Sequence, residues 1–179
     1  MKQVLGFIEY RSIAKGLEAT DVMLKGGKVE LIQATVMCPG KFVALISGDI
    51  SAVKESVEKG VNLDPALAIS SFVLPNIHPE VIPALSATSS AEVTGSLGII
   101  ETVDATSGVV AGDMAAKAAN VHLIEIRLAR GMGGKAFVYL CGELSAVKIA
   151  VKTACDKLAD EGVVLASSII ASPHPKLTF

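Results

Sequence analysis

The feature that most constrains this chain is an internal repeat. Gly6-Phe-Ile8-Glu9 returns as Gly98-Ile-Ile100-Glu101, 92 residues later, and Ser51-Ala-Val-Lys54 returns as Ser145-Ala-Val-Lys148. Shared landmarks keep the same order in both halves, so the pattern indicates a duplication without permutation. A repeat of this kind predicts one structural unit per copy. The chain is therefore expected to contain two tandem copies of one small fold.

A stretch rich in Ser and Thr, residues 86–95, separates the two copies and is typical of a linker. We expect the first domain to span residues 1–90 and the second domain residues 91–179. Domains of about 90 residues are small, so burial between the copies and between subunits would add to their stability.

Within each copy the residue pattern predicts the order β-α-β-β-α-β. Alternation of apolar and polar residues predicts strands, a helical period predicts helices, and Ser12 and Asp49 are the expected helix caps. This order predicts an α/β (α+β) fold of the ferredoxin-like type, a small antiparallel sheet with helices on one face. In the first copy, the predicted strands are residues 3–10, 29–37, 42–47 and 68–74, and the predicted helices are residues 12–26 and 50–59.

Charge and hydropathy argue against two classes of partner. The net charge is −2 at pH 7, and the short basic blocks Lys25–Lys28 and Arg127–Arg130 have no interleaved aromatic residues, so we expect no nucleic acid partner. The longest apolar stretch, Val163–Ala171, is about half as long as a membrane-spanning helix needs to be. The N-terminal residues do not resemble a signal peptide, and we expect a cytosolic protein without a membrane partner.

The three cysteines are an odd number at irregular spacing, which favours a reducing compartment over a disulfide framework. Cys141 and Cys155 lie in apolar segments and are expected to be small core residues. Cys38 precedes Pro39-Gly40 in a predicted turn. From the residues alone, Cys38 is interpreted as an ordinary loop thiol.

Two pairs of duplicated residues are not interpreted as metal or catalytic sites. His78 and His174 each precede a proline, and we expect them in structural or edge packing rather than as a pair of metal ligands. Glu9 and Glu101 also occupy matching places, but nothing marks them as an acid–base pair.

Several segments resemble one known family, the shell domains of bacterial microcompartments. In the second copy they are Gly98-Ile-Ile-Glu101-Thr, Asp113-Met-Ala-Ala-Lys117-Ala-Ala-Asn120-Val121, Gly133-Gly134-Lys135 and Gly142-Glu-Leu-Ser-Ala-Val. The first copy matches through residues 6–10, 21–25 and 39–41. Ser12-Ile-Ala-Lys15-Gly16 and Cys38-Pro39-Gly40-Lys41-Phe42 are similar to the tandem-domain shell protein of the propanediol-utilisation microcompartment.

The resemblance implies a structural protein and not an enzyme. Three two-domain chains would form a homotrimer with six domains around a central pore, a pseudohexamer that tiles edge to edge with other shell proteins. The expected location is the shell of a bacterial microcompartment in the cytoplasm. Lys25 and Lys117, at the ends of the first helix of each copy, are expected at the tile edge, where they would bond to a neighbouring tile.

The resemblance also implies that the turn between the second and third strands of each domain lines the pore. These turns are residues 37–41 and 130–135. The pore-lining residues predicted here are Met37, Cys38, Pro39, Gly40, Lys41, Met132, Gly133, Gly134 and Lys135.

In the similar tandem-domain shell protein, the cysteine of the Cys-Pro-Gly turn holds an iron–sulfur cluster, and Cys38 matches that residue. One cysteine cannot hold a cluster that needs about four ligands. Three copies of Cys38 around a threefold axis could hold one [4Fe–4S] cluster per trimer. Met132 occupies the matching place in the second copy, so the ligands would follow threefold and not sixfold symmetry.

Three functions are weighed on these grounds. The first is a shell tile whose pore cluster transfers electrons across the shell to enclosed redox enzymes, or serves cluster repair. The second is a shell tile with an empty pore that conducts small metabolites. The third, from another class, is a small ferredoxin-like enzyme or ligand-binding regulator with a site at a subunit interface.

Overall fold

The computed structural model describes residues 3–128 and 131–177 of the chain. The chain divides into two compact units, the first ending at Ile77 and the second beginning at His78. Each unit holds one antiparallel sheet of four strands. The two predicted copies of one fold are confirmed.

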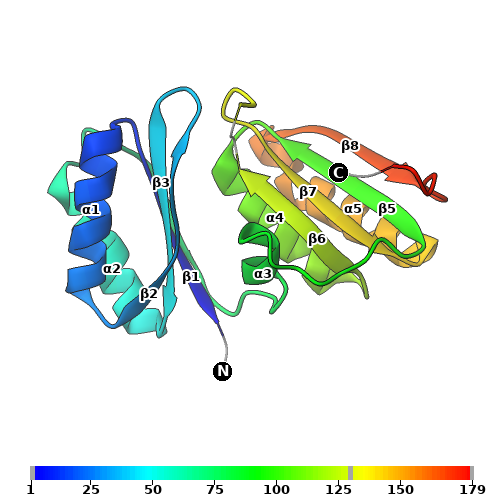
Figure 1. The fold of residues 1–179 in the computed structure, drawn as a ribbon, viewed down its shortest axis with the longest axis horizontal. Helices are drawn as coiled ribbons and strands as arrows, with labels where there is room; N and C mark the ends of the chain where they lie inside the picture. The colour runs from blue at the N-terminus through cyan, green and yellow to red at the C-terminus, as the bar shows by residue number, and fades with distance from the viewer. Residues whose placement is uncertain (1–2, 129–130, 178–179) are drawn as a thin grey trace. The chain divides into compact units, whose positions relative to one another are not determined.

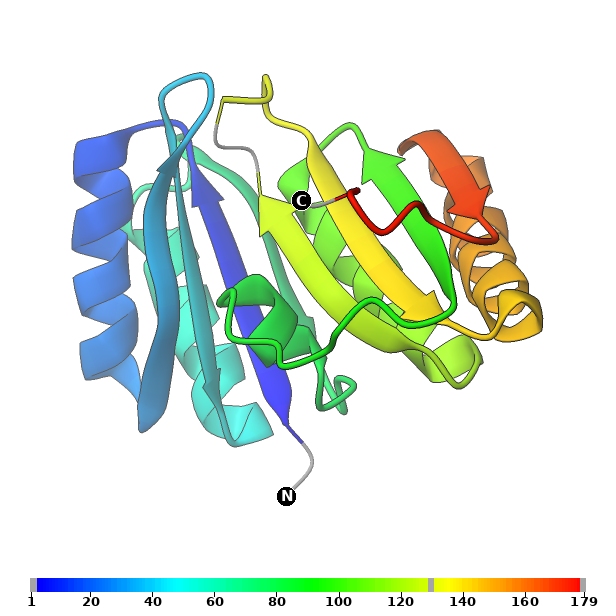
Figure 2. The ribbon, with the colours of Figure 1, turned by 45° about the vertical axis from the view of Figure 1, so that its right-hand side comes forward.

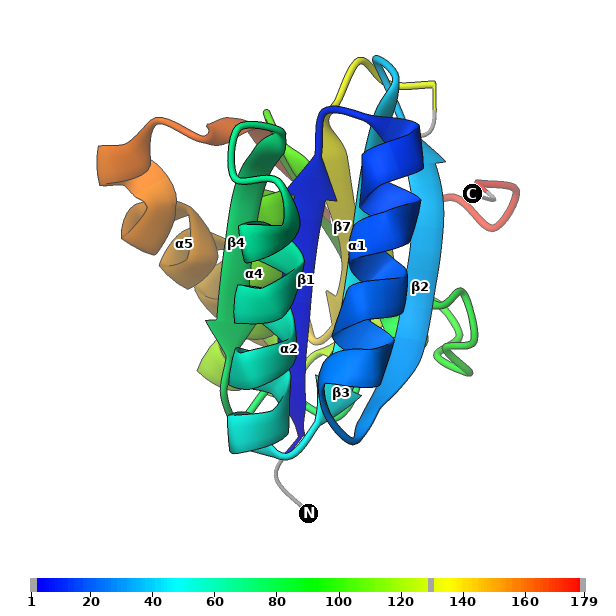
Figure 3. The same ribbon diagram turned by 90° about the vertical axis from the view of Figure 1, so that its left-hand side faces the viewer.

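In the first unit, helices α1 and α2 pack on one face of the sheet, which has the strand order β2-β3-β1-β4 (Figures 1 and 3). This order and the antiparallel pairing are those of a ferredoxin-like fold, so the predicted fold class is confirmed. The elements are β1 (Val4–Tyr10), α1 (Ile13–Gly26), β2 (Val29–Met37), β3 (Lys41–Gly48), α2 (Ile50–Leu63) and β4 (Ala68–Leu74).

The second unit repeats this arrangement, with the strand order β6-β7-β5-β8 and with α4 and α5 packed on the sheet (Figure 1). It begins with a short helix, α3, that has no counterpart among the described residues of the first unit and that the sequence pattern does not predict. The elements are α3 (Val81–Leu85), β5 (Ser96–Thr102), α4 (Ala105–Ala118), β6 (His122–Leu128), β7 (Ala136–Gly142), α5 (Leu144–Leu158), a 3₁₀ turn (Ala159–Glu161) and β8 (Val164–Ile170).

The duplication extends to irregularities in the sheets. The register of the first edge strand shifts between Leu31 and Gln33, and that of the second edge strand shifts between Leu123 and Glu125. A register shift changes which side chains face outward along the rest of the strand. Because both edge strands shift at the corresponding place, corresponding residues face outward in the two sheets.

Local signals account for where the first helix of each unit begins. The Ser12 hydroxyl accepts a hydrogen bond from the backbone N–H of Lys15 (3.3 Å), and the Asp104 carboxylate accepts one from the N–H of Ser107 (2.8 Å). Both side chains bond to the third residue after the cap, which satisfies a donor that the helix leaves unpaired. Asp49 also stands at the cap of its helix but makes no such bond.

Glycines bring each first helix close to its sheet. A Cβ atom on Gly16 would lie 2.6 Å from Cβ of Phe42, and one on Gly108 would lie 2.4 Å from Cβ of Ala136. These are matching places in the two copies. The duplicated glycine is therefore explained by the close approach of the helix to the strand behind it.

None of the described helices is long and apolar enough to cross a membrane.

Candidate functional site

The first predicted pore turn, residues 37–41, lies where β2 joins β3; Cys38, Pro39 and Gly40 form the connection, and Met37 and Lys41 are the adjoining strand ends (Figure 1). Pro39 and Gly40 are exposed, and Cys38 is half-buried. Gly40 has a φ of +79° and no atom within 4 Å of the place where a Cβ would stand. Glycine is suited to this position because of its positive φ, and crowding does not contribute.

The two residues that flank this turn are anchored in the unit. Met37 is 2% exposed at the end of β2. Lys41, at the start of β3, pairs through Nζ with Oε1 of Glu9 at 2.7 Å. The Glu9 side chain is 4% exposed, so this carboxylate is a buried charge with the Lys41 ammonium as its partner. The lysine next to the turn therefore already serves a structural pair.

The second predicted pore turn joins β6 to β7. Arg130, its first predicted residue, lies outside the described residues. Met132 is half-buried, Gly133 is exposed and Gly134 is buried. The backbone N–H of Lys135 donates to the carbonyl of Met132 at 3.4 Å, and both glycines have positive φ values, +66° and +95°. Met132, and not a cysteine, occupies the place that matches Cys38.

The second copy repeats the ion pair beside the turn. Lys135 Nζ lies 2.9 Å from Glu101 Oε1, but here the two side chains are 44% and 36% exposed. The sequence interpretation missed both pairs, although the signal was present: Glu9 and Lys41 return together as Glu101 and Lys135. Two oppositely charged residues that are duplicated together indicate a pair that the fold uses twice.

The remaining cysteines lie away from turns between strands. Cys141 is in β7, is fully buried and donates to the carbonyl of Glu92 at 3.3 Å, so its predicted core position is confirmed. Cys155 is half-buried in α5. Within residues 3–128 and 131–177, no group of three His, Cys, Asp or Glu side chains could hold a metal ion.

The two predicted tile-edge lysines lie in the last turn of α1 and α4. A cation there complements the partial negative charge of the helix end. Each also pairs with the aspartate four residues before it: Lys25 with Asp21 at 2.6 Å, and Lys117 with Asp113 at 2.5 Å. Lys25 is the more exposed of the two, at 75% of its side chain against 42%.

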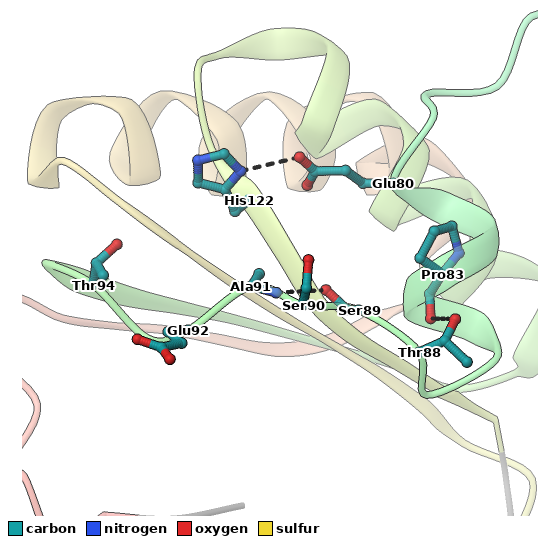
Figure 4. Close-up of a pocket in the computed structure, with 9 residues that line it drawn as sticks. All are labelled: Glu80, Pro83, Thr88, Ser89, Ser90, Ala91, Glu92, Thr94 and His122. Atoms are coloured by element: carbon teal, nitrogen blue, oxygen red, sulfur yellow. Dashed lines mark hydrogen bonds and ion pairs between the residues drawn. The ribbon is translucent and has the colours of Figure 1, made fainter.

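The segment that joins β4 to β5 along the chain packs on the second unit. The Ser89 hydroxyl donates to the carbonyl of Leu123 (2.8 Å) on the outer edge strand, and the chain then passes Cys141 of β7, so this segment crosses the sheet on the face opposite α4 and α5 (Figure 2). Glu80 and His122 pair at 3.0 Å beside it (Figure 4). They border a pocket of about 640 Å³ that is also lined by Pro83, Thr88, Ser89, Ser90, Ala91, Glu92 and Thr94.

Two stretches of the chain, residues 4–77 and 96–173, match the model of the BMC domain. A bacterial microcompartment shell protein, PduT of Citrobacter freundii, is 38% identical over 99% of this chain and 96% of its own length. The chain belongs to the BMC-domain family of microcompartment shell proteins. It is a structural shell protein with two tandem BMC domains, and its place is the shell of the compartment.

Solved structures of two proteins have the fold of this shell protein. The crystal structure of a microcompartment protein from Desulfitobacterium hafniense matches with a TM-score of 0.94 and 41% identity, over 97% of each chain. A fused, permuted hexameric shell protein, MSM0275 of the RMM microcompartment, matches with a TM-score of 0.64 over 87% of this chain and 81% of its own. At 24% identity this second likeness shows the fold alone.

Proposed function

We propose that three copies of this shell protein form a ring of six BMC domains, and that their Cys38 thiolates hold one [4Fe–4S] cluster at the threefold axis. The observation that carries the proposal is the place of Cys38. Among the described cysteines it is the one that lies in a turn between strands, with a half-buried side chain beside exposed Pro39 and Gly40. A fused shell protein of the same fold is described as hexameric, which supports a ring of six domains.

The donor set fits such a cluster. Thiolates are the ligands that these clusters require, and three of them account for three of the four irons. Met132 in the matching turn carries a thioether, which is a weaker ligand for iron than a thiolate. Three strong ligands and three weak ones would therefore alternate around the ring. Threefold alternation is what one cluster with three cysteine ligands needs.

When bound, the cluster would supply one-electron transfer. Within a closed shell, a cluster at a pore is suited to pass electrons to enclosed redox enzymes or to hold a cluster for repair. The Lys41 ammonium is paired with Glu9, so it contributes little net charge to offset the thiolates. The other partners in this proposal are neighbouring shell proteins, which the tile would contact at its edges through Lys25 and Lys117.

The test is anaerobic purification or reconstitution, followed by iron and sulfide analysis and absorption spectroscopy. Wild-type protein should be brown, with about four irons per three chains. Cys38→Ser should lose both the colour and the iron while light scattering still gives a mass of about three chains.

Cys141→Ala and Cys155→Ala are the matched controls, and both should keep the colour. A brown Cys38→Ser variant, or wild type without iron after reconstitution, would overturn the cluster. A trimer without iron would favour the empty pore that conducts small metabolites. A monomer would overturn the ring itself.

A further inference from the structure

A short arm at the start of the second unit is held on that unit by four contacts. The backbone N–H of His78 donates to Oδ1 of Asp113 on α4 at 2.8 Å. Glu80 Oε2 accepts the backbone N–H of Leu123 at 2.7 Å, and its other oxygen pairs with Nδ1 of His122 at 3.0 Å (Figure 4). The fourth contact is apolar: Val81 is fully buried in α3, which packs against β6 and α4. We call residues 78–81 the first arm.

The chain contains a second arm with the same sequence signal and the same turn. Residues 174–177 follow β8 as residues 78–81 follow β4. In the first arm, His78 accepts the N–H of Glu80 at Nδ1 (3.4 Å), and its carbonyl accepts the N–H of Val81 (3.0 Å). In the second arm, His174 does the same for Lys176 (3.1 Å) and Leu177 (2.8 Å).

The two arms differ in what covers them. Val81 is fully buried, whereas Leu177, in the matching place, is 46% exposed. All four residues of the second arm are exposed. The second arm therefore already has the turn of the docked first arm, although it is exposed. Because this turn is formed in advance, docking would cost less conformational entropy.

The first unit presents the surface that matches the one under the first arm. Asp21, Glu30 and Leu31 stand where Asp113, His122 and Leu123 stand in the second unit. These three residues are exposed, and Leu31 is 45% exposed although Leu123 is fully buried. Among the described residues, no side chain takes the part of Glu80 beside Leu31. The same edge of the same fold is thus covered in one copy and uncovered in the other.

The charges of the second arm fit this uncovered surface. In the second unit, an acid on the arm (Glu80) meets a histidine on the strand (His122). At the matching places, the second arm carries a base (Lys176) and the strand of the first unit carries an acid (Glu30). Within the described chain neither of these two side chains has an ion-pair partner. The acid and the base have exchanged places between arm and strand, and the two charges are still opposite.

We infer that the second arm of one chain docks on α1 and β2 of a second copy of this chain. Lys176 then pairs with Glu30, the N–H of His174 donates to Asp21, and Leu177 covers Leu31. The second copy is the occupant because the first arm passes from the first domain to the second, and in a ring the matching step from the second domain leads to the first domain of the next chain. This inference rests on the proposed ring.

The reversed charges also give the ring its order. A Glu80 arm placed on the Glu30 surface would bring two carboxylates together, and a Lys176 arm placed on the His122 surface would lose its acidic partner. Like-charge contacts of this kind exclude a wrong neighbour more strongly than the correct pair attracts the right one. First and second domains are therefore expected to alternate around the ring.

Cysteine cross-linking between chains of two sizes tests the inference. All chains carry Cys38→Ser, so that the thiols proposed to meet at the threefold axis cannot cross-link. A tagged chain carrying Leu31→Cys is co-expressed with an untagged chain carrying Leu177→Cys, and the purified particle is oxidised mildly. A covalent dimer of one tagged and one untagged chain is expected. Particles in which both chains carry only Leu31→Cys, or only Leu177→Cys, are the controls and should give none.

The outcomes separate the arm from the ring. No cross-link in a particle that light scattering shows to be a trimer would overturn the arm and leave the ring. A cross-link in a particle of another size would keep the arm and overturn the trimer. With both cysteines in one chain, a cross-link confined to that chain would also overturn the inference, because the arm would then dock on its own first unit.

A charge exchange tests the pair itself. Lys176→Glu and Glu30→Lys should each lower the cross-linking yield at low salt by about threefold, the effect expected for one exposed pair. The double variant should restore the yield. Lys148→Glu, at an exposed lysine of α5, is the matched control and should change nothing. Equal yields in all four variants would overturn the Lys176–Glu30 pair.

Discussion

At the scale of single residues, the duplication places the same ion pair in two environments. Glu9 and Lys41 form a nearly buried pair, whereas Glu101 and Lys135 form a pair that is more than one-third exposed. The folded state is strongly destabilised when a buried carboxylate loses its cationic partner, because water cannot solvate the charge that remains. An exposed carboxylate depends on it much less.

We therefore predict that Lys41→Ala lowers the free energy of unfolding by about 1–3 kcal/mol, since it leaves Glu9 buried without its cation. Lys135→Ala, the matched control in the second copy, should cost less than about 1 kcal/mol. Urea unfolding of both variants measures the difference. Equal losses would contradict the idea that burial decides the value of this pair, and adding Glu9→Gln to Lys41→Ala should recover part of the loss.

At the scale of elements, one strand fixes the end of one helix. The predicted helix ends at Lys59, but α2 continues to Leu63. Gly60, which would ordinarily weaken the helix, is the residue whose carbonyl accepts the buried hydroxyl of Tyr10 at 2.6 Å. A Cβ atom at Gly60 would lie 2.6 Å from Cγ of Met23. The glycine is thus required by its close contact with α1, whereas the carbonyl that bonds to Tyr10 could come from any residue.

Tyr10→Phe should destabilise the protein by about 1–2 kcal/mol, because it removes a buried hydrogen bond. Burial raises the pKa of the Tyr10 hydroxyl above its ordinary value of about 10. The folded protein therefore keeps this proton at a pH where the unfolded chain loses it. The stabilisation from Tyr10 should be complete below about pH 10 and should shrink as the pH rises further.

Chemical unfolding of wild type and Tyr10→Phe between neutral and alkaline pH measures this effect. The gap between the two proteins should narrow above about pH 10. A gap that stays constant, or widens, would show that the Tyr10 hydroxyl does not hold its proton more tightly in the folded state.

At the scale of the whole molecule, folding and assembly into sheets depend on different residues. Lys25 and Lys117 each pair only with an aspartate of their own helix among the described contacts. The Lys25–Asp21 pair is exposed on both sides and contributes at most about 1 kcal/mol to folding. The Asp113 side chain is only 9% exposed, so its pair with Lys117 contributes more. The same two cations are exposed enough to bond to a neighbouring tile.

Replacing both Lys25 and Lys117 with Ala should leave the mass of the particle unchanged. Any fall in the melting temperature should come from Lys117, because Asp113 is nearly buried and loses its cation, whereas Lys25→Ala alone should leave the melting temperature nearly unchanged. Sheet formation, followed by electron microscopy, should fall sharply. Exchanging the exposed Lys54 and Lys148 of α2 and α5 for Ala is the matched control and should leave the sheets intact. Normal sheets from the Lys25/Lys117 variant would contradict the prediction that these lysines bond to a neighbouring tile.

The sequence by itself determined the duplication, the order of strands and helices, and the family, because these depend on patterns that recur along the chain. Hydrophobic periodicity and the Ser12 cap are local signals, and local signals can be read without knowing which segments meet. The repeated Gly16 and Gly108 could be found in the same way, but their reason could not.

The tertiary structure alone decided which copy of the repeated ion pair is buried and which copy of a surface is covered. Leu31 and Leu123 are the same residue at the same place of the same fold, yet one is exposed and the other is buried. Nothing in the local sequence separates them. The difference comes from α3, a five-residue helix containing Pro83, which is held by contacts with β6 and α4 rather than by its own helical propensity.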